Sequence, residues 1–148
     1  MLHRAALALV AETLADAEDD WWLVGGAAVA LQGLDIAIAD IDVLMSRRDI
    51  DRVIARLGIA PVQGVASDRI RSEVWARWTT PPAAVDLMTG LKVRSDGRWM
   101  RVAPASRQAV NVEGRTLYVP ARSELIEILR LFGRPKDLER AEGLARIA

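Results

Sequence analysis

The sequence predicts one α+β domain that covers residues 1–148, and three observations support this prediction. Segments in which apolar residues recur at helical spacing alternate with short apolar segments that are typical of β-strands. No internal repeat, linker or low-complexity segment interrupts this order. The chain has 51% hydrophobic and 27% charged residues, which is the composition of a soluble globular domain with a sizeable core.

The N-terminal half is predicted to contain three helices and two strands. The helices are expected at residues 2–18, 26–33 and 46–58, and the strands at residues 21–26 and 38–45. The third helix has the clearest ends. Ser46 can serve as its N-cap with Asp49 at the third position after it, as in a capping box, and Gly58 can end it.

The C-terminal half is predicted to begin with a loop or edge segment and to end with two helices. The loop is expected at residues 59–70, strands at 71–80 and 83–90, a hairpin at 107–120, and helices at 123–133 and 135–147. Pro81 and Pro82 separate the two strands, and the hairpin is expected to turn at Glu113 and Gly114. Pro135 falls in the first turn of its helix, where its missing N–H breaks no helical hydrogen bond.

Composition excludes several classes of site. The chain has no cysteine, so disulfides, thiolate metal sites and cysteine nucleophiles are excluded. No apolar segment approaches the length of a membrane span, and the N-terminus lacks the plan of a signal peptide. We therefore expect a cytoplasmic protein with no membrane partner.

Charge is balanced over the whole chain but not along it. The formal net charge is zero, so no global basic field points to nucleic acid. Residues 92–122, however, hold Lys92 and six arginines against Asp96 and Glu113. This basic segment has two interpretations: the solvated faces of hairpins, or a rim that meets a phosphate-bearing partner.

Three aspartates lie in apolar segments that are expected to form strands. Asp40 and Asp42 are two residues apart in "IADIDVLM", so a strand would place both on one face, where they repel each other unless a cation lies between them. Asp86 occupies a similar place in "AAVDLMTG", on the same face as Met88. Carboxylates in this arrangement suit Mg²⁺. The alternative is an exposed sheet edge at which the acids simply meet water.

A double glycine, Gly25 and Gly26, stands between a predicted strand and a predicted helix, fourteen residues before Asp40. Two glycines allow a tight turn whose backbone can approach a ligand closely, which suits a phosphate. Most such turns are only turns, so this motif is weak evidence by itself.

Together, "LVGGAAVALQG", "DID" with apolar flanks, "VDL" and the C-terminal "SELIEILRLFGRPKDLERAEGL" resemble small bacterial stand-alone nucleotidyltransferases of the DNA polymerase beta type. The resemblance implies a mixed sheet flanked by helices, with the C-terminal helices closing the domain. It implies that Gly25, Gly26 and Ala27 bind the triphosphate of an NTP, and that Asp40, Asp42 and Asp86 are the catalytic, metal-binding carboxylates. The implied metal is Mg²⁺, with Mn²⁺ as the alternative.

The implied reaction transfers a nucleoside monophosphate from the NTP to an acceptor hydroxyl. Acceptors in this superfamily include antibiotics, tRNA ends and proteins, among them the toxins of toxin–antitoxin pairs, and the sequence does not choose among them. It also leaves a monomer and a homodimer open.

Four positions depart from the family pattern. Apolar residues replace polar groups that could contact phosphate at these positions, which are Ala27, Ile36, Ile38 and Leu129. They keep open a second interpretation, in which the chain retains the fold as a nucleotide-binding or protein-binding module with weak or no catalysis.

Other residues carry two interpretations each. Trp75 and Trp78 either pack on the sheet or stack on a base or a partner. Arg134 and Lys136, at the start of the last helix, are either exposed or reach a phosphate or an acceptor. Asp68 and Glu73 are expected to be surface groups.

Overall fold

The computed structural model describes residues 3–62 and 67–147. In this part of the chain the elements follow one another as α1 (Arg4–Thr13), β1 (Trp22–Val24), α2 (Gly25–Leu31), β2 (Ile41–Leu44), α3 (Arg47–Leu57), β3 (Ile70–Arg71), β4 (Val74–Trp78), β5 (Val85–Thr89), β6 (Lys92–Ser95), β7 (Arg98–Arg101), β8 (Gln108–Val112), β9 (Arg115–Val119), α4 (Arg122–Phe132) and α5 (Pro135–Ala145). No helix among these is long and apolar enough to cross a membrane.

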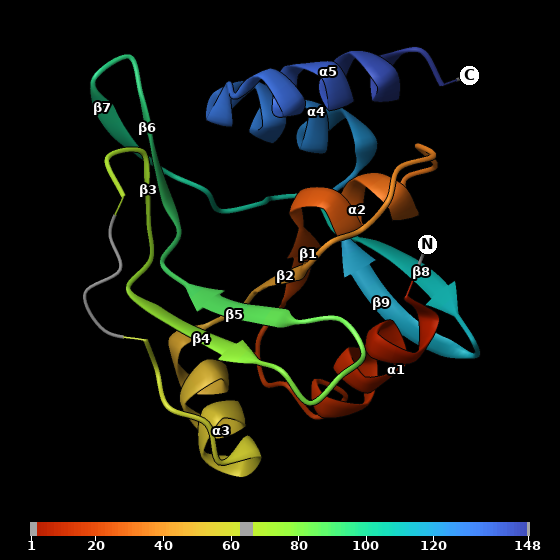
Figure 1. Cartoon of the computed structure of the whole chain (residues 1–148), viewed down its shortest axis with the longest axis vertical. Helices are drawn as coiled ribbons and strands as arrows, with labels where there is room; N and C mark the ends of the chain where they lie inside the picture. The colour runs from red at the N-terminus through yellow and green to blue at the C-terminus, as the bar shows by residue number, and fades with distance from the viewer. Residues whose placement is uncertain (1–2, 63–66, 148) are drawn as a thin grey trace.

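Four strands form a central sheet in the order β1-β2-β5-β4. β2 and β5 run parallel, whereas β1 and β4 are antiparallel to their neighbours. Figure 1 shows α3 close to one end of the molecule, beside β4 and β5, and the pair α4 and α5 at the opposite end. A mixed sheet flanked by helices, with two C-terminal helices, confirms the predicted fold class.

Two smaller sheets extend this unit. One has the strand order β3-β6-β7, and the other is the hairpin of β8 and β9. The hairpin turns at Glu113 and Gly114 as predicted, with positive φ at both residues. The sequence analysis did not predict β6 and β7, which turn at Asp96 and Gly97 with the same backbone conformation. An Asp-Gly turn is a recognised hairpin signal that could have revealed this pair.

The structure confirms the predicted third helix and both of its ends. The hydroxyl of Ser46 accepts a hydrogen bond from the backbone N–H of Asp49 at 3.3 Å. Gly58 ends the helix with φ 67°, in the left-handed region that glycine adopts without strain. The predicted strands, the 107–120 hairpin and the last two helices are also present, with bounds shifted by a few residues.

The first helix is shorter than the predicted range 2–18, of which residue 2 lies outside the described part. α1 ends at Thr13, and turns follow it. The reason is tertiary, because α3 holds the next residues away from a helical path. Asp49 accepts the N–H groups of Glu18 and Asp19, both at 3.0 Å, and Arg52 donates to the carbonyl of Asp16 at 3.1 Å.

The strand predicted at residues 38–45 is also shorter, and this corrects the position of Asp40. β2 begins at Ile41, so Asp40 lies in the bend directly before the strand. The neighbouring strand β1 pairs Val24 with Asp42 and ends there, because α2 begins at Gly25. No residue of β1 remains to pair with the chain before Asp42.

The core occupies one face of the central sheet. The strand residues of this face are fully or almost fully buried, and they are Leu23, Ile41, Val43, Val85 and Leu87. A second cluster packs on the opposite face of the central sheet, where Val24 and Leu44 join Val93 of β6 and the side chains of α4. The remaining part of that face carries polar side chains.

Candidate functional site

Three charged side chains lie in one row across the central sheet. Asp42 of β2 is the register partner of Asp86 on β5, and Asp86 is the partner of Arg77 on β4. Val24 completes the row on β1. Side chains at paired positions share a face of the sheet. The two aspartates, which are far apart in the sequence, therefore lie side by side as the resemblance implies.

Arg77 binds two of the three aspartates. Its Nε and Nη2 atoms donate to the two carboxylate oxygens of Asp86 at 2.9 and 3.0 Å, which is a bidentate pair. Its Nη2 atom also lies 3.5 Å from Oδ2 of Asp40. Asp86 is buried in this pair, whereas the side chain of Asp40 is partly exposed.

Asp42 has no such partner among the described residues, since the ion pairs of this site join Arg77 to Asp86 and to Asp40. Burial raises the pKa of Asp42 to about 7, and the negative charges of Asp86 and Asp40 add to this effect. The positive charges of Arg134 and Lys136 oppose it. A cation bound beside Asp42 would therefore stabilise the charged form of its carboxylate.

The double glycine lies directly against Asp42. Gly25 has φ 64°, and a Cβ atom added to it would lie 2.7 Å from Oδ2 of Asp42, a distance that real side chains do not tolerate. A Cβ atom on Gly26 would lie 3.6 Å from Nη1 of Arg140 on α5. Glycine at the first position is thus required by both backbone conformation and close approach to the acid.

The N-terminal part of α5 supplies the positive side of the site. Lys136 is exposed, which is one of the two interpretations given above. Arg134 is partly buried, and its Nε atom donates a hydrogen bond to Asp137 at 2.6 Å. Asp137 also accepts the backbone N–H of Arg134 at 3.3 Å and so caps the helix. Arg140 therefore faces Gly26, and the charge of Lys136 acts on Asp42, from a helix whose start is fixed.

The four positions that depart from the family pattern belong to the core. Ala27 is 0% exposed, Ile38 4% and Leu129 3%, and Ile36 packs against the same cluster. Their side chains contribute to packing and offer no polar contact to a phosphate. The polar groups of this site therefore lie in the glycine turn, the acids and α5.

A pocket of about 250 Å³ opens beside Asp86. Its wall is mostly apolar and includes Trp75 and Met88, the next row of the same sheet face. Trp75 is partly buried here, whereas Trp78 is buried in the core. Asp68 and Glu73 are exposed, as predicted.

The residues fit a divalent cation in part. Asp42 and Asp40 offer the carboxylate oxygens that Mg²⁺ and Mn²⁺ prefer, and Asp42 needs a positive neighbour. Within residues 3–62 and 67–147, however, no three His, Cys, Asp or Glu side chains gather into a metal-binding group. The third carboxylate, Asp86, is instead bound to Arg77.

The sequence analysis missed Arg77 and Arg140. A signal for Arg77 was present: a hairpin centred on Pro81 and Pro82 pairs residue 77 with residue 86. Arg140 follows Lys136 by one helical turn, so it shares a face of α5 with that lysine. Its closeness to Gly26 depends on how α5 packs and has no local signal.

Comparison with known proteins supports the fold. No protein-family model matches the sequence, and no curated protein matches it by sequence similarity. Solved structures do match: TM1012 from Thermotoga maritima, described as a nucleotidyltransferase, aligns with a TM-score of 0.70, at 20% identity, over 95% of this chain and 88% of its own.

Two antibiotic-modifying proteins also share the fold. The lincosamide adenylyltransferase LnuA, in its lincomycin-bound form, aligns with a TM-score of 0.63 at 13% identity, over 97% of this chain and 96% of its own. ANT(2'')-Ia, in complex with adenylyl-2''-tobramycin, aligns with a TM-score of 0.61 at 12% identity, over 98% of this chain and 88% of its own. At these identities, the likeness establishes a nucleotidyltransferase-like fold.

Proposed function

We propose that this chain, as a single domain of residues 1–148, transfers a nucleoside monophosphate from an NTP to an acceptor hydroxyl. One observation carries the proposal: Asp42, held unpaired against Gly25 and beside Asp86, has its pKa raised to about 7. A carboxylate in this position is destabilised until a cation joins it. The cation–triphosphate pair of a nucleotidyl transfer is a ligand of the required charge.

In this proposal Asp42 and Asp40 would hold Mg²⁺ or Mn²⁺, and the cation would supply positive charge to neutralise the triphosphate. Gly25 and Gly26, followed by Ala27, leave room for the phosphates against Asp42. Arg140 and Lys136 face them from α5 and stabilise their negative charge. The site works in the cytoplasm, where NTP and Mg²⁺ are both abundant.

Asp86 is assigned to the acceptor side. Its carboxylate borders the pocket that contains Trp75, so a hydroxyl bound there can donate its proton toward Asp86. Arg77 fixes the orientation of Asp86 through two hydrogen bonds, at 2.9 and 3.0 Å. Arg77 is therefore a positioning residue, since it acts through Asp86 and Asp40.

A second candidate function is nucleotide or protein binding without efficient catalysis. The buried, apolar side chains of Ala27, Ile38 and Leu129 favour it, because they remove polar contacts that would stabilise a transition state. The retention of Asp42 in a costly environment favours the enzyme. The two functions differ in whether pyrophosphate is released.

The test is thermal unfolding with each NTP, with and without Mg²⁺, followed by a pyrophosphate-release assay. A ligand at about 100 times its Kd adds roughly 2.7 kcal/mol, which for a domain of this size raises Tm by about 5–10 °C. We expect a Mg²⁺-dependent rise in the wild type and none in Asp42→Asn. Asp51→Asn, which changes an exposed carboxylate on α3, is the matched control and should keep the full rise.

The outcomes separate the candidates. A rise without pyrophosphate release in the presence of candidate acceptors would support the binding module. If no NTP shifts Tm at millimolar concentration, the site binds no nucleotide with useful affinity. The transferase function and the nucleotide-binding function would then both be wrong, and protein binding would be the function left.

A further inference from the structure

The three-stranded sheet β3-β6-β7 has one face of unusual composition. Its register pairs Arg71 with Lys92 and Lys92 with Arg101, so these three cations lie in one row across all three strands. Two residues further along, Arg94 pairs with Trp99 on the same face. We call this surface the basic face and define it as Arg71, Lys92, Arg94, Trp99 and Arg101.

The basic face points away from the protein core. The alternate residues Val93 and Ile70 lie on the opposite face, and Val93 is 0% exposed in its packing with α4. The four cations of the basic face are exposed, and Trp99 is partly exposed. In Figure 1, the β6–β7 hairpin extends beyond the central sheet toward the end of the molecule that carries α4 and α5.

The charge of this face is not neutralised within the described part of the chain. The ion pairs there involve other arginines of the basic segment, with Arg107 bound to Asp20 and Arg115 bound to Glu12. None of them includes Arg71, Lys92, Arg94 or Arg101. Like charges at directly opposite positions of a sheet destabilise it, so three of them in one row need a compensating partner.

The aromatic residue adds a second property. The guanidinium of Arg71 lies 3.9 Å from the centre of the Trp99 ring, in a cation–π stack. Flat aromatic and guanidinium groups both stack on nucleobases, and cations between them bind phosphates. A pocket of about 310 Å³ at the edge of this face is lined by Arg71, Lys92 and Arg101 and by one acid, Glu73. Arg47 lies 3.7 Å from the Glu73 carboxylate, so the three cations leave the pocket with an excess of positive charge that suits a phosphate.

We propose that the basic face binds the phosphate backbone of a single-stranded nucleic acid. Charge complementarity and the stack of Arg71 on Trp99 favour this partner over an anionic membrane, because Trp99 is the one large apolar side chain of the face and the guanidinium of Arg71 covers its ring. They favour it over an acidic protein, because base stacking uses the ring and the guanidinium plane as well as the charge.

The basic face adjoins the candidate site. Arg71 and Ser72 line both the pocket beside Asp86 and the pocket of the basic face. Binding to the face does not depend on the proposed transferase activity. A second step, in which the bound strand also serves as the acceptor of the nucleotidyl group, does rest on that proposed function.

The test is fluorescence anisotropy with labelled single-stranded RNA and DNA of about 12 nucleotides, without NTP or Mg²⁺, at several salt concentrations. In the double variant Arg94→Ala/Arg101→Ala we expect affinity to fall at least about ten-fold at low salt, with a salt dependence shallower by about 0.7 per lost phosphate contact. The matched control is Arg98→Ala/Arg146→Ala. It removes two exposed arginines, one on the opposite face of β7 and one on the C-cap of α5.

The control should lose less than about two-fold in affinity, because its arginines lie off the face. Equal losses in both double variants would show a diffuse charge effect and overturn the proposal. So would wild-type protein that binds neither oligonucleotide at low salt, or that binds phosphatidylserine vesicles in preference to them. Because NTP is absent, failure here leaves the thermal-shift test of the transferase function unaffected.

Discussion

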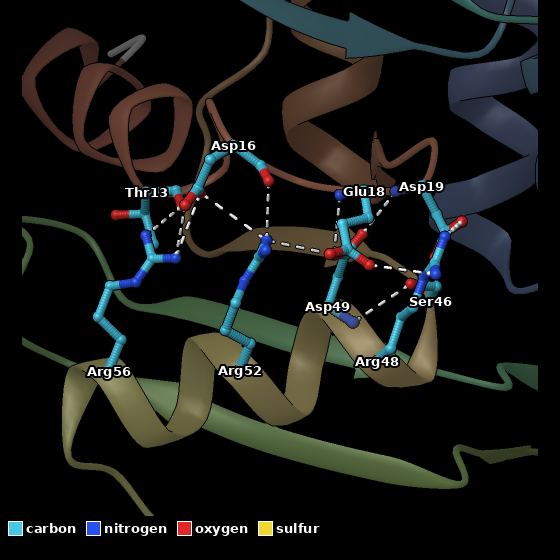
Figure 2. Close-up of polar contacts among 9 residues, drawn as sticks. All are labelled: Thr13, Asp16, Glu18, Asp19, Ser46, Arg48, Asp49, Arg52 and Arg56. Atoms are coloured by element: carbon cyan, nitrogen blue, oxygen red, sulfur yellow. Dashed lines mark hydrogen bonds and ion pairs between the residues drawn. The ribbon is translucent and has the colours of Figure 1, made fainter.

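Two regions of this protein use the same residue types in opposite ways. One is the α3 clamp, which we define as Asp49, Arg48, Arg52 and Arg56 of α3 with Asp16, Glu18 and Asp19 of the loop after α1. Figure 2 shows this clamp, in which the three arginines leave α3 side by side and meet the acids of the loop. The other is the row of Asp42, Asp86 and Arg77, joined by Asp40.

The pKa values of two aspartates express the difference. Hydrogen bonds from Arg48, and then from Ser46, lower the pKa of Asp19 to about 2. Burial and the neighbouring acids raise the pKa of Asp42 to about 7. In the clamp, every carboxylate is bound by an arginine of this chain. In the row, one arginine serves two of three acids, and the third is left for a partner from outside.

The comparison shows which charges hold the fold together and which reduce its stability. A buried carboxylate that accepts several N–H groups stabilises the arrangement of those groups, and its removal leaves them without partners. A partly buried carboxylate with no cation beside it, such as Asp42, reduces the stability of the folded state until a ligand binds. Substitutions in the two regions should therefore change the free energy of unfolding in opposite directions.

The largest effect is expected for Asp49→Ala. Asp49 is 1% exposed and accepts the N–H groups of Glu18 and Asp19 at 3.0 Å and a guanidinium N–H of Arg52 at 3.2 Å. We expect the free energy of unfolding to fall by about 3 kcal/mol, the usual range for breaking a buried, hydrogen-bonded charge pair. Chemical denaturation with urea measures this value.

Asp49→Asn serves as the graded control, because an amide keeps one acceptor oxygen of similar size. It should lose less stability than Asp49→Ala but more than a surface substitution. If both variants unfold at the wild-type urea concentration, the clamp does not stabilise the fold and its contrast with the acid row disappears.

The second effect has the opposite sign, and it concerns Asp42→Asn without ligand. Because the folded-state pKa of Asp42 is raised to about 7, the native state holds a proton that the unfolded chain releases near pH 4. The stability that this proton contributes is complete below about pH 4 and is lost as the pH rises toward about 7. At about pH 8 the neutral asparagine should therefore be more stable than the aspartate, by about 1–3 kcal/mol.

Urea unfolding of both proteins at about pH 5 and pH 8 measures the dependence, and the gain should be larger at the higher pH. Saturating NTP with Mg²⁺ should reverse the order, since it stabilises only the wild type. A variant that is less stable than the wild type at pH 8 would show that Asp42 is already compensated within the chain. The acid row would then resemble the clamp.

Sequence alone predicted most of the fold and singled out the three aspartates of the acid row, because both rest on local patterns. The apolar periodicity around Ile50 and Val53 and the glycine at 58 define α3, and the "DID" and "VDL" segments identify the acids. The pairing of Arg77 with Asp86 depends on strand register, and the place of Arg140 depends on helix packing. Both are set by contacts between segments far apart in the sequence.

The basic face shows the same limit. The excess of cations in residues 92–122 was visible, but the segment divides in the structure into arginines with partners, such as Arg107 and Arg115, and cations without them. Only the register of β3, β6 and β7 brings Arg71 into the row with Lys92 and Arg101. The alternation of side chains along a strand shows which residues share a face of the sheet. It does not predict which other strand will pair with that strand.

The smallest effect is expected at the rim of the clamp. Arg56 donates from Nη2 to Asp16 at 3.0 Å and from Nη1 to the carbonyl of Thr13 at 3.2 Å, and both side chains of this pair are exposed. Because water and salt screen such a pair, Arg56→Ala should lower Tm by only about 1 °C, and by less at high salt. Scanning calorimetry at low and high salt measures both values. A Tm loss as large as that of Asp49→Ala would mean that the clamp acts as one cooperative unit, with its strength spread over the exposed arginines instead of centred on the buried aspartate.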